Sequence, residues 1–316
     1  MTAPGTAGAA KESEAIDSAT ARRMVAEHPL WYHTMDVAPG VTTPGWFDLR
    51  PIVDRLPWPD VRGKRCLDVG PYDGFLAFEL ERRGAAEVVA VDIGAHEDWD
   101  WPVRLRDRSG ALAELAGPEV GAGFELARRL LGSAVERRVL SVYDLSPAEV
   151  GRFDVVVCGA LMLHLRDPLR ALEAIRSVCD GHFLSAEEIV IELSIRHRRQ
   201  PLARLNGVDH LCQWWVPNAA GHRRMVEAAG FDVARQTRPY AVPFGPAHPP
   251  PGRGLSTLRT AILTRLGTGA RGVPYTATLA VPGVSISPGP SPSRGLGRRT
   301  GPAPGEPGDG TRAAGR

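Results

Sequence analysis

The chain has 316 residues, of which 43% are hydrophobic, so it can bury a sizeable core in one large domain or two small ones. Its formal net charge of +2 is too small to require a polyanionic partner. No stretch approaches the roughly 18 apolar residues of a membrane-spanning helix, and the first residues lack the pattern of a signal peptide, so we expect a cytoplasmic protein.

The cysteines lack the CxxC spacing that is typical of metal and redox sites. They are Cys66, Cys158, Cys179 and Cys212. Because Cys66 and Cys158 fall in predicted buried strands, we expect reduced thiols rather than a disulfide framework or a zinc site. No metal is predicted.

The first part of the chain divides at about residue 12. Residues 1–12 are small and polar, and we expect them to be disordered. Residues 13–27 are compatible with a helix, whereas residues 31–56 are rich in aromatic residues, Pro and Gly without a clear period. Residues 13–60 therefore form either a lid over a site or an arm that covers the surface.

The stretch RCLDVGPYDG, which ends at Gly74, predicts a strand, a tight turn and the start of a helix. The apolar run Cys66–Val69 is the strand, and Phe75–Arg83 has the apolar spacing of a helix. Gly70 and Gly74 supply the turn between them. Such a turn suits a nucleotide-like ligand, because the backbone comes close and the helix start offers unpaired N–H groups. An ordinary strand-to-helix turn is the alternative.

Three further apolar runs each lead into a polar or glycine residue. Glu87–Val91 is closed by Asp92, close to the roughly 20-residue spacing at which an acid can bind ribose hydroxyls. After a predicted helix over residues 124–131, the run Arg138–Val142 leads into Tyr143 and Asp144, and Phe153–Cys158 leads into Gly159. This arrangement is expected if a ligand lies across the carboxyl edge of a parallel sheet.

The second half continues the alternation of helices and strands. We predict helices from Pro168 to Val178, with Leu169 on its apolar face, and from the cap Asn218 through Ala229. The predicted strands are Phe183–Ala186, Phe231–Ala234 and Tyr275–Val281. Residues 241–254 are predicted to be a loop, and residues 283–316, rich in Pro, Gly, Ser and Arg, a disordered tail.

These residues resemble the class I S-adenosylmethionine-dependent methyltransferases. The first motif of that class is an acid followed by three alternate glycines, and here it reads Asp68, Gly70, Tyr72 and Gly74, with Tyr72 in place of the middle glycine. The resemblance implies S-adenosyl-L-methionine as cofactor. It also implies an α/β fold over residues 61–282, a Rossmann-like, seven-stranded, mostly parallel sheet with helices on both faces and an antiparallel last strand.

Part of the chain is similar to the tRNA wobble-uridine carboxymethyltransferase group and its small-molecule relatives. The matching segments are Trp31–Trp46, LDVGPYDG, Leu161–Pro168 and Trp214–Asn218. That group has a tyrosine where this chain has Leu163, and a lysine for which Arg50 is the nearest basic substitute. Both differences favour ordinary S-adenosylmethionine over its carboxylated form.

The resemblance also implies roles for individual residues. The expected cofactor-binding residues are Asp68, Gly70, Tyr72, Gly74, Asp92, Tyr143, Asp144 and Gly159. Among them, Asp68 would buttress the turn or reach the amino-acid end, Asp92 would bind the ribose diol, and Asp144 would accept from the adenine amino group. His164 is the candidate acid, base or substrate contact, with a structural hydrogen bond as the alternative. The expected substrate residues are Trp46, Arg50, Trp214 and Trp215, although both residues of the last pair could simply pack.

We therefore predict methyl transfer to a small-molecule or nucleoside acceptor. The alternative enzyme is a tRNA carboxymethyltransferase, for which the basic stretch Arg196–Arg204 could meet phosphate, although a solvated face explains that stretch as well. A cofactor-binding module without catalysis is the alternative from another class. An NAD-dependent reductase is disfavoured, because GPYDG lacks the GxGxxG spacing.

Overall fold

The computed structural model describes residues 16–108, 110, 113–114, 119–207, 213–250 and 254–284. The disorder predicted for residues 1–12, and for all but the first two residues of 283–316, lies outside these ranges. Cys212 also lies outside them, whereas Cys66, Cys158 and Cys179 are free and buried.

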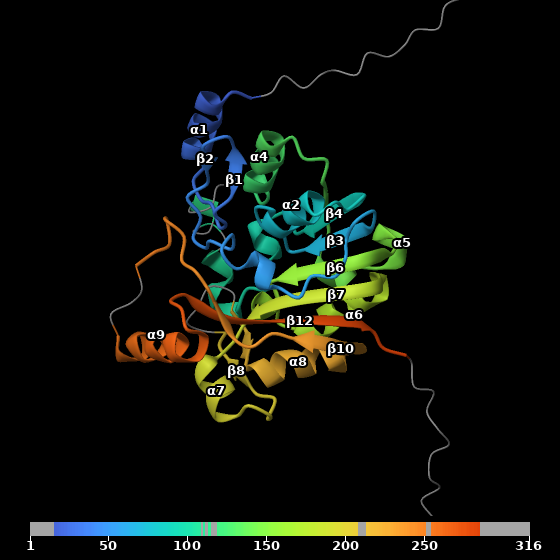
Figure 1. The fold of residues 1–316 in the computed structure, drawn as a ribbon, viewed down its shortest axis with the longest axis vertical. Coiled ribbons are helices and arrows are strands. Elements are labelled where there is room, and N and C mark those ends of the chain that lie inside the picture. The colour runs from blue at the N-terminus through green and yellow to red at the C-terminus, as the bar shows by residue number, and fades with distance from the viewer. Residues whose placement is uncertain are drawn as a thin grey trace, which may run out of the picture. The chain divides into compact units, whose positions relative to one another are not determined.

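A mixed sheet forms the centre of the fold, with the strand order β10-β12-β7-β6-β3-β4-β5 and with β11 also paired to β12 (Figure 1). The strands are β3 Arg65–Val69, β4 Glu87–Asp92, β5 Glu136–Val139, β6 Phe153–Gly159, β7 Cys179–Glu188, β10 Phe231–Gln236, β11 Tyr240–Val242 and β12 Val273–Pro282. The five neighbouring strands β7, β6, β3, β4 and β5 are parallel, and β12 runs antiparallel to β7, β10 and β11. The predicted seven-stranded, mostly parallel sheet is confirmed, and β11 is a short addition to it.

Helices cover both faces of this sheet, because the central strands are apolar on both sides. The helices are α1 Ser18–Glu27, α2 Phe75–Arg82, α4 Ala122–Leu131, α5 Pro147–Val150, α6 Pro168–Val178, α7 Ile191–Arg196, α8 Ala219–Ala228 and α9 Leu255–Thr268. On one face, α2 and α4 pack over Cys66 and Val155 together with the N-terminal segment. On the other face, α5, α6 and α8 pack over Leu67 and Val156. Alternation along each strand thus divides one sheet between two cores.

Helix caps explain where α6 and α8 begin. The Asp167 side chain accepts from the Arg170 N–H at 3.1 Å ahead of Pro168, and Asn218 accepts from the Gly221 N–H at 2.7 Å. Both predicted starts are confirmed. Leu169 was wrongly placed on the buried face of α6: it is exposed, because Ala171 completes that face instead.

Two local predictions need correction. The strand predicted to reach Val142 ends at Val139, because β5 is an edge strand and the Ser141 hydroxyl caps a short 3₁₀ turn, Val142–Asp144. The predicted loop 241–254 overlaps β11, whose residues gain ladder bonds from β12.

Several elements were not predicted from the sequence. They are the helices α7 and α9, the hairpin-like pair β8 Ala203–Leu205 and β9 Trp215–Pro217, and the pair β1 Asp36–Ala38 and β2 Val41–Thr42. These strands are only two or three residues long, so hydrophobic alternation cannot identify them. Among the helices in the described ranges, none has both the length and the apolarity needed to cross a membrane.

The N-terminal segment is built into the fold by backbone pairing with the segment that follows β11. The Asp48 N–H donates to the Pro243 carbonyl at 3.0 Å, and the Gly245 N–H donates to the Trp46 carbonyl at 2.7 Å. Trp31 is buried in the core on the α2 side of the sheet, and its indole N–H donates to the Val25 carbonyl. Residues 31–56 therefore pair with the residues after β11 and contribute side chains to the core on the α2 side of the sheet.

Candidate active site

The turn between β3 and α2 has a backbone that suits glycine. Gly70 has a φ of 71°, and its N–H donates to the Val91 carbonyl at 2.9 Å. Gly74 has a φ of 95°, and a Cβ there would lie 2.5 Å from the Phe78 ring. Tyr72 also has a positive φ, 54°, which is uncommon for a residue with a side chain. The turn thus depends on two glycines and one strained tyrosine.

Asp68 is a buried acid without a counterpart. It precedes the turn by two residues and is 1% exposed, and neither of its carboxylate oxygens has a hydrogen-bond partner in the described part of the chain. Burial raises the pKa of Asp68 to about 8, the Asp92 carboxylate acts in the same direction, and the nearby Ala77 N–H in the first turn of α2 opposes them more weakly. An unpaired acid of this kind is poised to meet a cationic group.

Asp92 anchors the same turn from the end of β4. Its carboxylate accepts from the Tyr72 N–H at 3.2 Å and from the Ile93 N–H at 2.9 Å. Burial raises the pKa of Asp92 to about 6. Each oxygen keeps further acceptor capacity, so the carboxylate can both hold the turn and bind a ligand hydroxyl.

Asp73 ties the turn to the N-terminal segment, a contact that sequence reasoning missed. It is 1% exposed and accepts from the backbone N–H groups of Tyr32 and His33, each at 2.8 Å. The His33 ring makes a further short contact with the same carboxylate. The only signal in the sequence was that Asp73 lies within the motif.

Replacing Asp73 by alanine is expected to lower the free energy of unfolding by about 3 kcal/mol, because two buried N–H groups lose a charged acceptor. Denaturant unfolding at neutral pH measures this loss. Asp232→Ala is the control, since Asp232 is exposed on β10. Equal losses in the two variants would show that Asp73 does not hold the segment.

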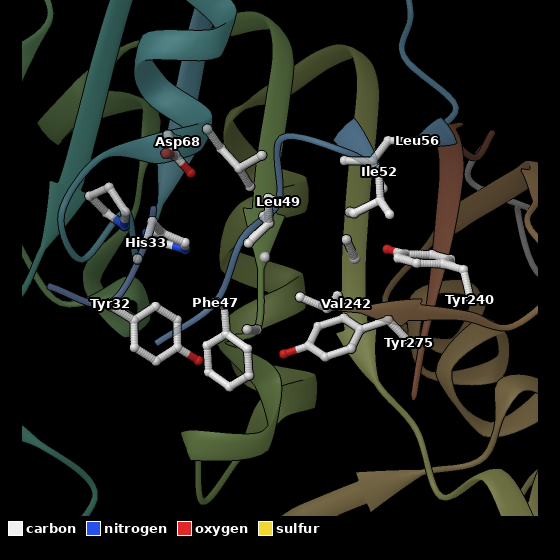
Figure 2. A pocket seen from close by; sticks show the side chains of 16 residues that line it. Tyr32, His33, Phe47, Leu49, Ile52, Leu56, Asp68, Tyr240, Val242 and Tyr275 are labelled. Atoms are coloured by element: carbon white, nitrogen blue, oxygen red, sulfur yellow. The ribbon is translucent and has the colours of Figure 1, made fainter. Parts of the chain in front are cut away.

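A cavity lies between the N-terminal segment and the carboxyl edge of the sheet (Figure 2). About 560 Å³ of space is free of protein atoms, including the opening to solvent. The lining residues are Tyr32, His33, Phe47, Leu49, Ile52, Leu56, Asp68, Gly70, Pro71, Leu76, Gly159, Ala160, Ala186, Tyr240, Val242 and Tyr275. In Figure 2 the hydroxyl groups of Tyr240 and Tyr275 point toward the middle of the cavity, and that of Tyr32 points toward Phe47. The structure thus brings three predicted residues, Asp68, Gly70 and Gly159, to one aromatic-walled cavity.

Two glutamates end β7 directly after Ala186, which lines the cavity. Glu188 lies directly opposite Tyr275 in the sheet register, on the same face as Ala186. Burial raises the pKa of Glu188 to about 7. Glu187 points to the other face, where it accepts from the N–H groups of Leu161 and Met162, and burial raises its pKa to about 8. Sequence reasoning missed both, because the predicted strand stopped at Ala186.

Four other predicted residues gather away from this cavity. The Trp214 indole N–H donates to the Asp100 carbonyl at 2.6 Å, and the Trp215 indole N–H donates to the Arg166 carbonyl at 3.1 Å. The Tyr143 hydroxyl donates to the Asp100 carboxylate at 2.5 Å. His164 has its ring 5.5 Å from that of Trp99. These residues form one cluster over the strand ends of β4 and β6, and none of them lines the cavity.

Asp144, Trp46 and Arg50 have different surroundings again. Asp144 is exposed on the 3₁₀ turn after β5. The Trp46 ring is partly buried, 6.4 Å from that of Tyr32. The Arg50 guanidinium is on the surface, where it bonds the carboxylates of Asp48 and Asp36 at 2.8 Å each.

The residues at the carboxyl edge fit S-adenosylmethionine on their own chemistry. Asp68 offers an unpaired carboxylate to an ammonium group, and Asp92 offers acceptors to hydroxyls. A Cβ on Gly159 would lie 2.9 Å from the end of the Leu76 side chain, which would have to shift to admit it. Among the described residues, no cluster of three His, Cys, Asp or Glu side chains is placed to hold a metal ion.

Comparison with known proteins agrees with this geometry. The profile of a family described as "Methyltransferase domain" matches residues 48–236. The chain belongs to this family. The class predicted from the sequence, that of the class I S-adenosylmethionine-dependent methyltransferases, is thereby confirmed, with S-adenosylmethionine as the cofactor that the family implies.

Similar curated proteins include the ubiquinone biosynthesis O-methyltransferases of Neisseria meningitidis serogroup C, 33% identical over 115 residues, and of Acinetobacter baumannii strain AYE, 31% identical over 129 residues. The matched regions are 36% and 39% of this chain and span only 39% and 45% of those relatives. Among solved structures, the N-terminal domain of EvdMO1 with SAH bound is similar with a TM-score of 0.50 and 14% identity, over 87% of this chain and 100% of that one. This last likeness shows the fold alone.

Proposed function

We propose that the protein transfers the methyl group of S-adenosylmethionine to the hydroxyl of a small aromatic acceptor. The observation that carries the proposal is the cavity, because it joins Asp68 and Gly159 at the sheet edge to the rings of Tyr32, Phe47 and Tyr275. Aromatic walls favour a planar, largely apolar acceptor. The similar curated proteins are named as O-methyltransferases, which supports oxygen as the methylated atom.

In this proposal the residues at the sheet edge hold the cofactor. Asp68 binds the ammonium of its amino-acid end, and Asp92 binds the ribose hydroxyls. Gly70, Gly74 and Gly159 let the backbone approach. We keep Tyr72, Tyr143 and Asp144 among the proposed cofactor-binding residues, because Tyr72 lies in the turn and the other two lie after a neighbouring strand. When bound, the cofactor supplies a methyl group that its sulfonium already activates, so alignment is the main service of the protein.

The acceptor hydroxyl still has a proton to lose, and Glu188 is the proposed general base. Glu188 lies opposite Tyr275, whose ring lines the cavity, and in this proposal its carboxylate takes that proton as the oxygen gains the methyl group. A base with a pKa near 7 suits this transfer at neutral pH. His164, whose ring packs with that of Trp99, stays the alternative acid, base or substrate contact. Trp46, Arg50, Trp214 and Trp215 are not needed for the acceptor in this scheme.

A nucleoside acceptor, tRNA and the carboxylated cofactor stay alternative predictions. Leu163, the residue that argued for plain S-adenosylmethionine, is buried, and its carbonyl accepts from the Trp214 N–H at 2.6 Å. Arg50 already bonds two carboxylates on the surface. Since an unpaired buried carboxylate on the ligand would be costly, these surroundings support the plain cofactor.

Calorimetric titration with S-adenosylhomocysteine tests the cofactor site, and release of this product from a panel of phenols and catechols tests the acceptor. Binding is expected in the first assay and turnover of at least one phenol in the second. Asp92→Ala should weaken binding about 10- to 100-fold, because charge-assisted bonds to the ribose are lost.

Glu97→Ala is the matched control for Asp92→Ala, since Glu97 is exposed shortly after β4. Unchanged affinity in folded Asp92→Ala would contradict the cofactor assignment. Binding without turnover of any phenol would leave the cofactor site intact and exclude the proposed acceptor.

A further inference from the structure

Helix α9 packs against the rest of the fold through its polar side. Thr264 is 1% exposed, and Thr257 and Thr268 are partly buried on the same side of the helix. The helix lies against α7 and the β11 and β12 strands, as Figure 1 shows for α7. The Thr264 hydroxyl has no side-chain hydrogen bond in the described residues, so this contact does not depend on polar pairing.

The apolar side of α9 faces outward instead. Leu255, Leu258, Ile262 and Leu266 are 87%, 57%, 51% and 76% exposed. Their spacing of three and four residues places them in one stripe along about 17 Å of helix. We call these four residues the α9 stripe. A soluble helix normally shows the reverse arrangement, so this stripe needs something to cover it.

The surroundings of the α9 stripe are strongly basic. The exposed arginines on or next to α7 and α9 are Arg196, Arg198, Arg199, Arg259, Arg265 and Arg271. One acid, Glu192, pairs with both Arg196 and Arg259. The other four arginines form no ion pair with a described residue, and α9 itself carries no acidic side chain. The basic stretch singled out in the sequence therefore joins an apolar helix face.

We propose that α9 docks on the surface of an anionic lipid bilayer. An apolar stripe enters the interface between headgroups and acyl chains, while flanking arginines meet lipid phosphates. Two copies of this chain paired through the α9 stripe would bring their unpaired arginines together, which disfavours a dimer. Residues 285–316 contain only Ile286 and Leu296 as large aliphatic residues, too few to cover the stripe.

Helix α9 lies close to the cavity proposed for the acceptor. The helix contacts β11, whose Tyr240 and Val242 line the cavity. A bilayer held at α9 would therefore lie near the walls that receive the acceptor. The docking surface itself does not depend on which acceptor is methylated.

The test is co-flotation of the full chain with vesicles of phosphatidylcholine alone and of phosphatidylcholine mixed with phosphatidylglycerol. Binding is expected to the mixed vesicles and to fall as salt rises. The variant Leu258→Ser/Ile262→Ser/Leu266→Ser should lose at least about tenfold in vesicle affinity, because three interfacial side chains become polar. Arg265→Gln/Arg271→Gln should lose about tenfold on the mixed vesicles only.

The matched control is Val139→Ser/Leu169→Ser, which changes exposed apolar residues on other elements and should bind like wild type. Thermal unfolding and S-adenosylhomocysteine binding check that every variant is folded. If the triple serine variant bound vesicles as well as wild type, the proposal would be overturned. Binding would then come from the arginines alone, because the variant keeps all of them, including those beyond residue 284. Absence of vesicle binding would also overturn the proposal. Sedimentation would then show whether the stripe forms a dimer that the triple variant breaks, and a binding assay with RNA would show whether the arginines meet RNA phosphates instead.

Discussion

Glu188→Gln is expected to lower kcat for a phenolic acceptor by about 10²- to 10⁴-fold, because the variant cannot accept the hydroxyl proton. In the wild type, kcat should rise with pH through about 7 and then level off, since the carboxylate is protonated below its raised pKa and basic above it. The variant should lose this rise. Rates of S-adenosylhomocysteine release at a series of pH values measure both effects.

Glu187→Gln is the matched control for this prediction. Glu187 is the adjacent glutamate and is the more deeply buried of the two, but its side chain points to the other face of the sheet toward Leu161 and Met162. We expect it to change kcat less than tenfold and to keep the rise near pH 7. If both variants lost activity equally with the same pH profile, the loss would reflect packing rather than a base.

Asp68→Asn is expected to act in opposite directions on cofactor binding and on stability. In the wild type, affinity for S-adenosylmethionine should rise up to about tenfold per pH unit below about 8, because the bound ammonium requires the ionised carboxylate. The variant should bind more weakly and without this pH dependence. Calorimetric titrations between about pH 6 and 9 give both quantities.

Stability should respond with the other sign. The folded-state pKa of Asp68 lies above its unfolded value of 3.8, so folding favours the protonated acid. Its contribution is fully present below the unfolded pKa and is lost as pH rises to about 8, by up to about 1.4 kcal/mol per pH unit. Asp68→Asn removes this loss and should be the more stable protein at alkaline pH. A variant that was less stable than wild type there would contradict the unpaired state of Asp68.

The contrast between Asp68 and Glu188 shows what the sequence could predict. Asp68 lies on a buried strand before a glycine turn, a local pattern that placed strand, turn and helix within one or two residues. Glu188 matters because β12 runs back beside β7 and sets Tyr275 opposite it, a pairing between residues far apart in the chain. No periodicity within either strand contains that information.

The wrong or missing elements have the same origin. Helix α9 turns leucines to the outside and Thr264 to the inside, so the usual reading of apolar spacing does not apply to it. The family resemblance implies a cofactor role for Tyr143, and its hydroxyl bond to Asp100 connects two loops that no pattern within either loop would pair. When a residue's contacts are made by a segment far away in the chain, the local sequence pattern does not predict those contacts or the role that depends on them.

The N-terminal segment and the part of the chain from β11 onward, which pair through their backbones, supply the walls proposed for the acceptor, whereas the proposed cofactor residues come from the part of the chain between them. Tyr32, Phe47, Tyr240 and Tyr275 all lie outside residues 48–236, the part shared with the methyltransferase family, whereas Asp68 and Asp92 lie inside it. The rings that wall the cavity can thus be exchanged without altering the residues proposed to hold the cofactor. A chimera that exchanges both flanks together would be the natural unit of acceptor change, because each flank supplies hydrogen bonds to the other.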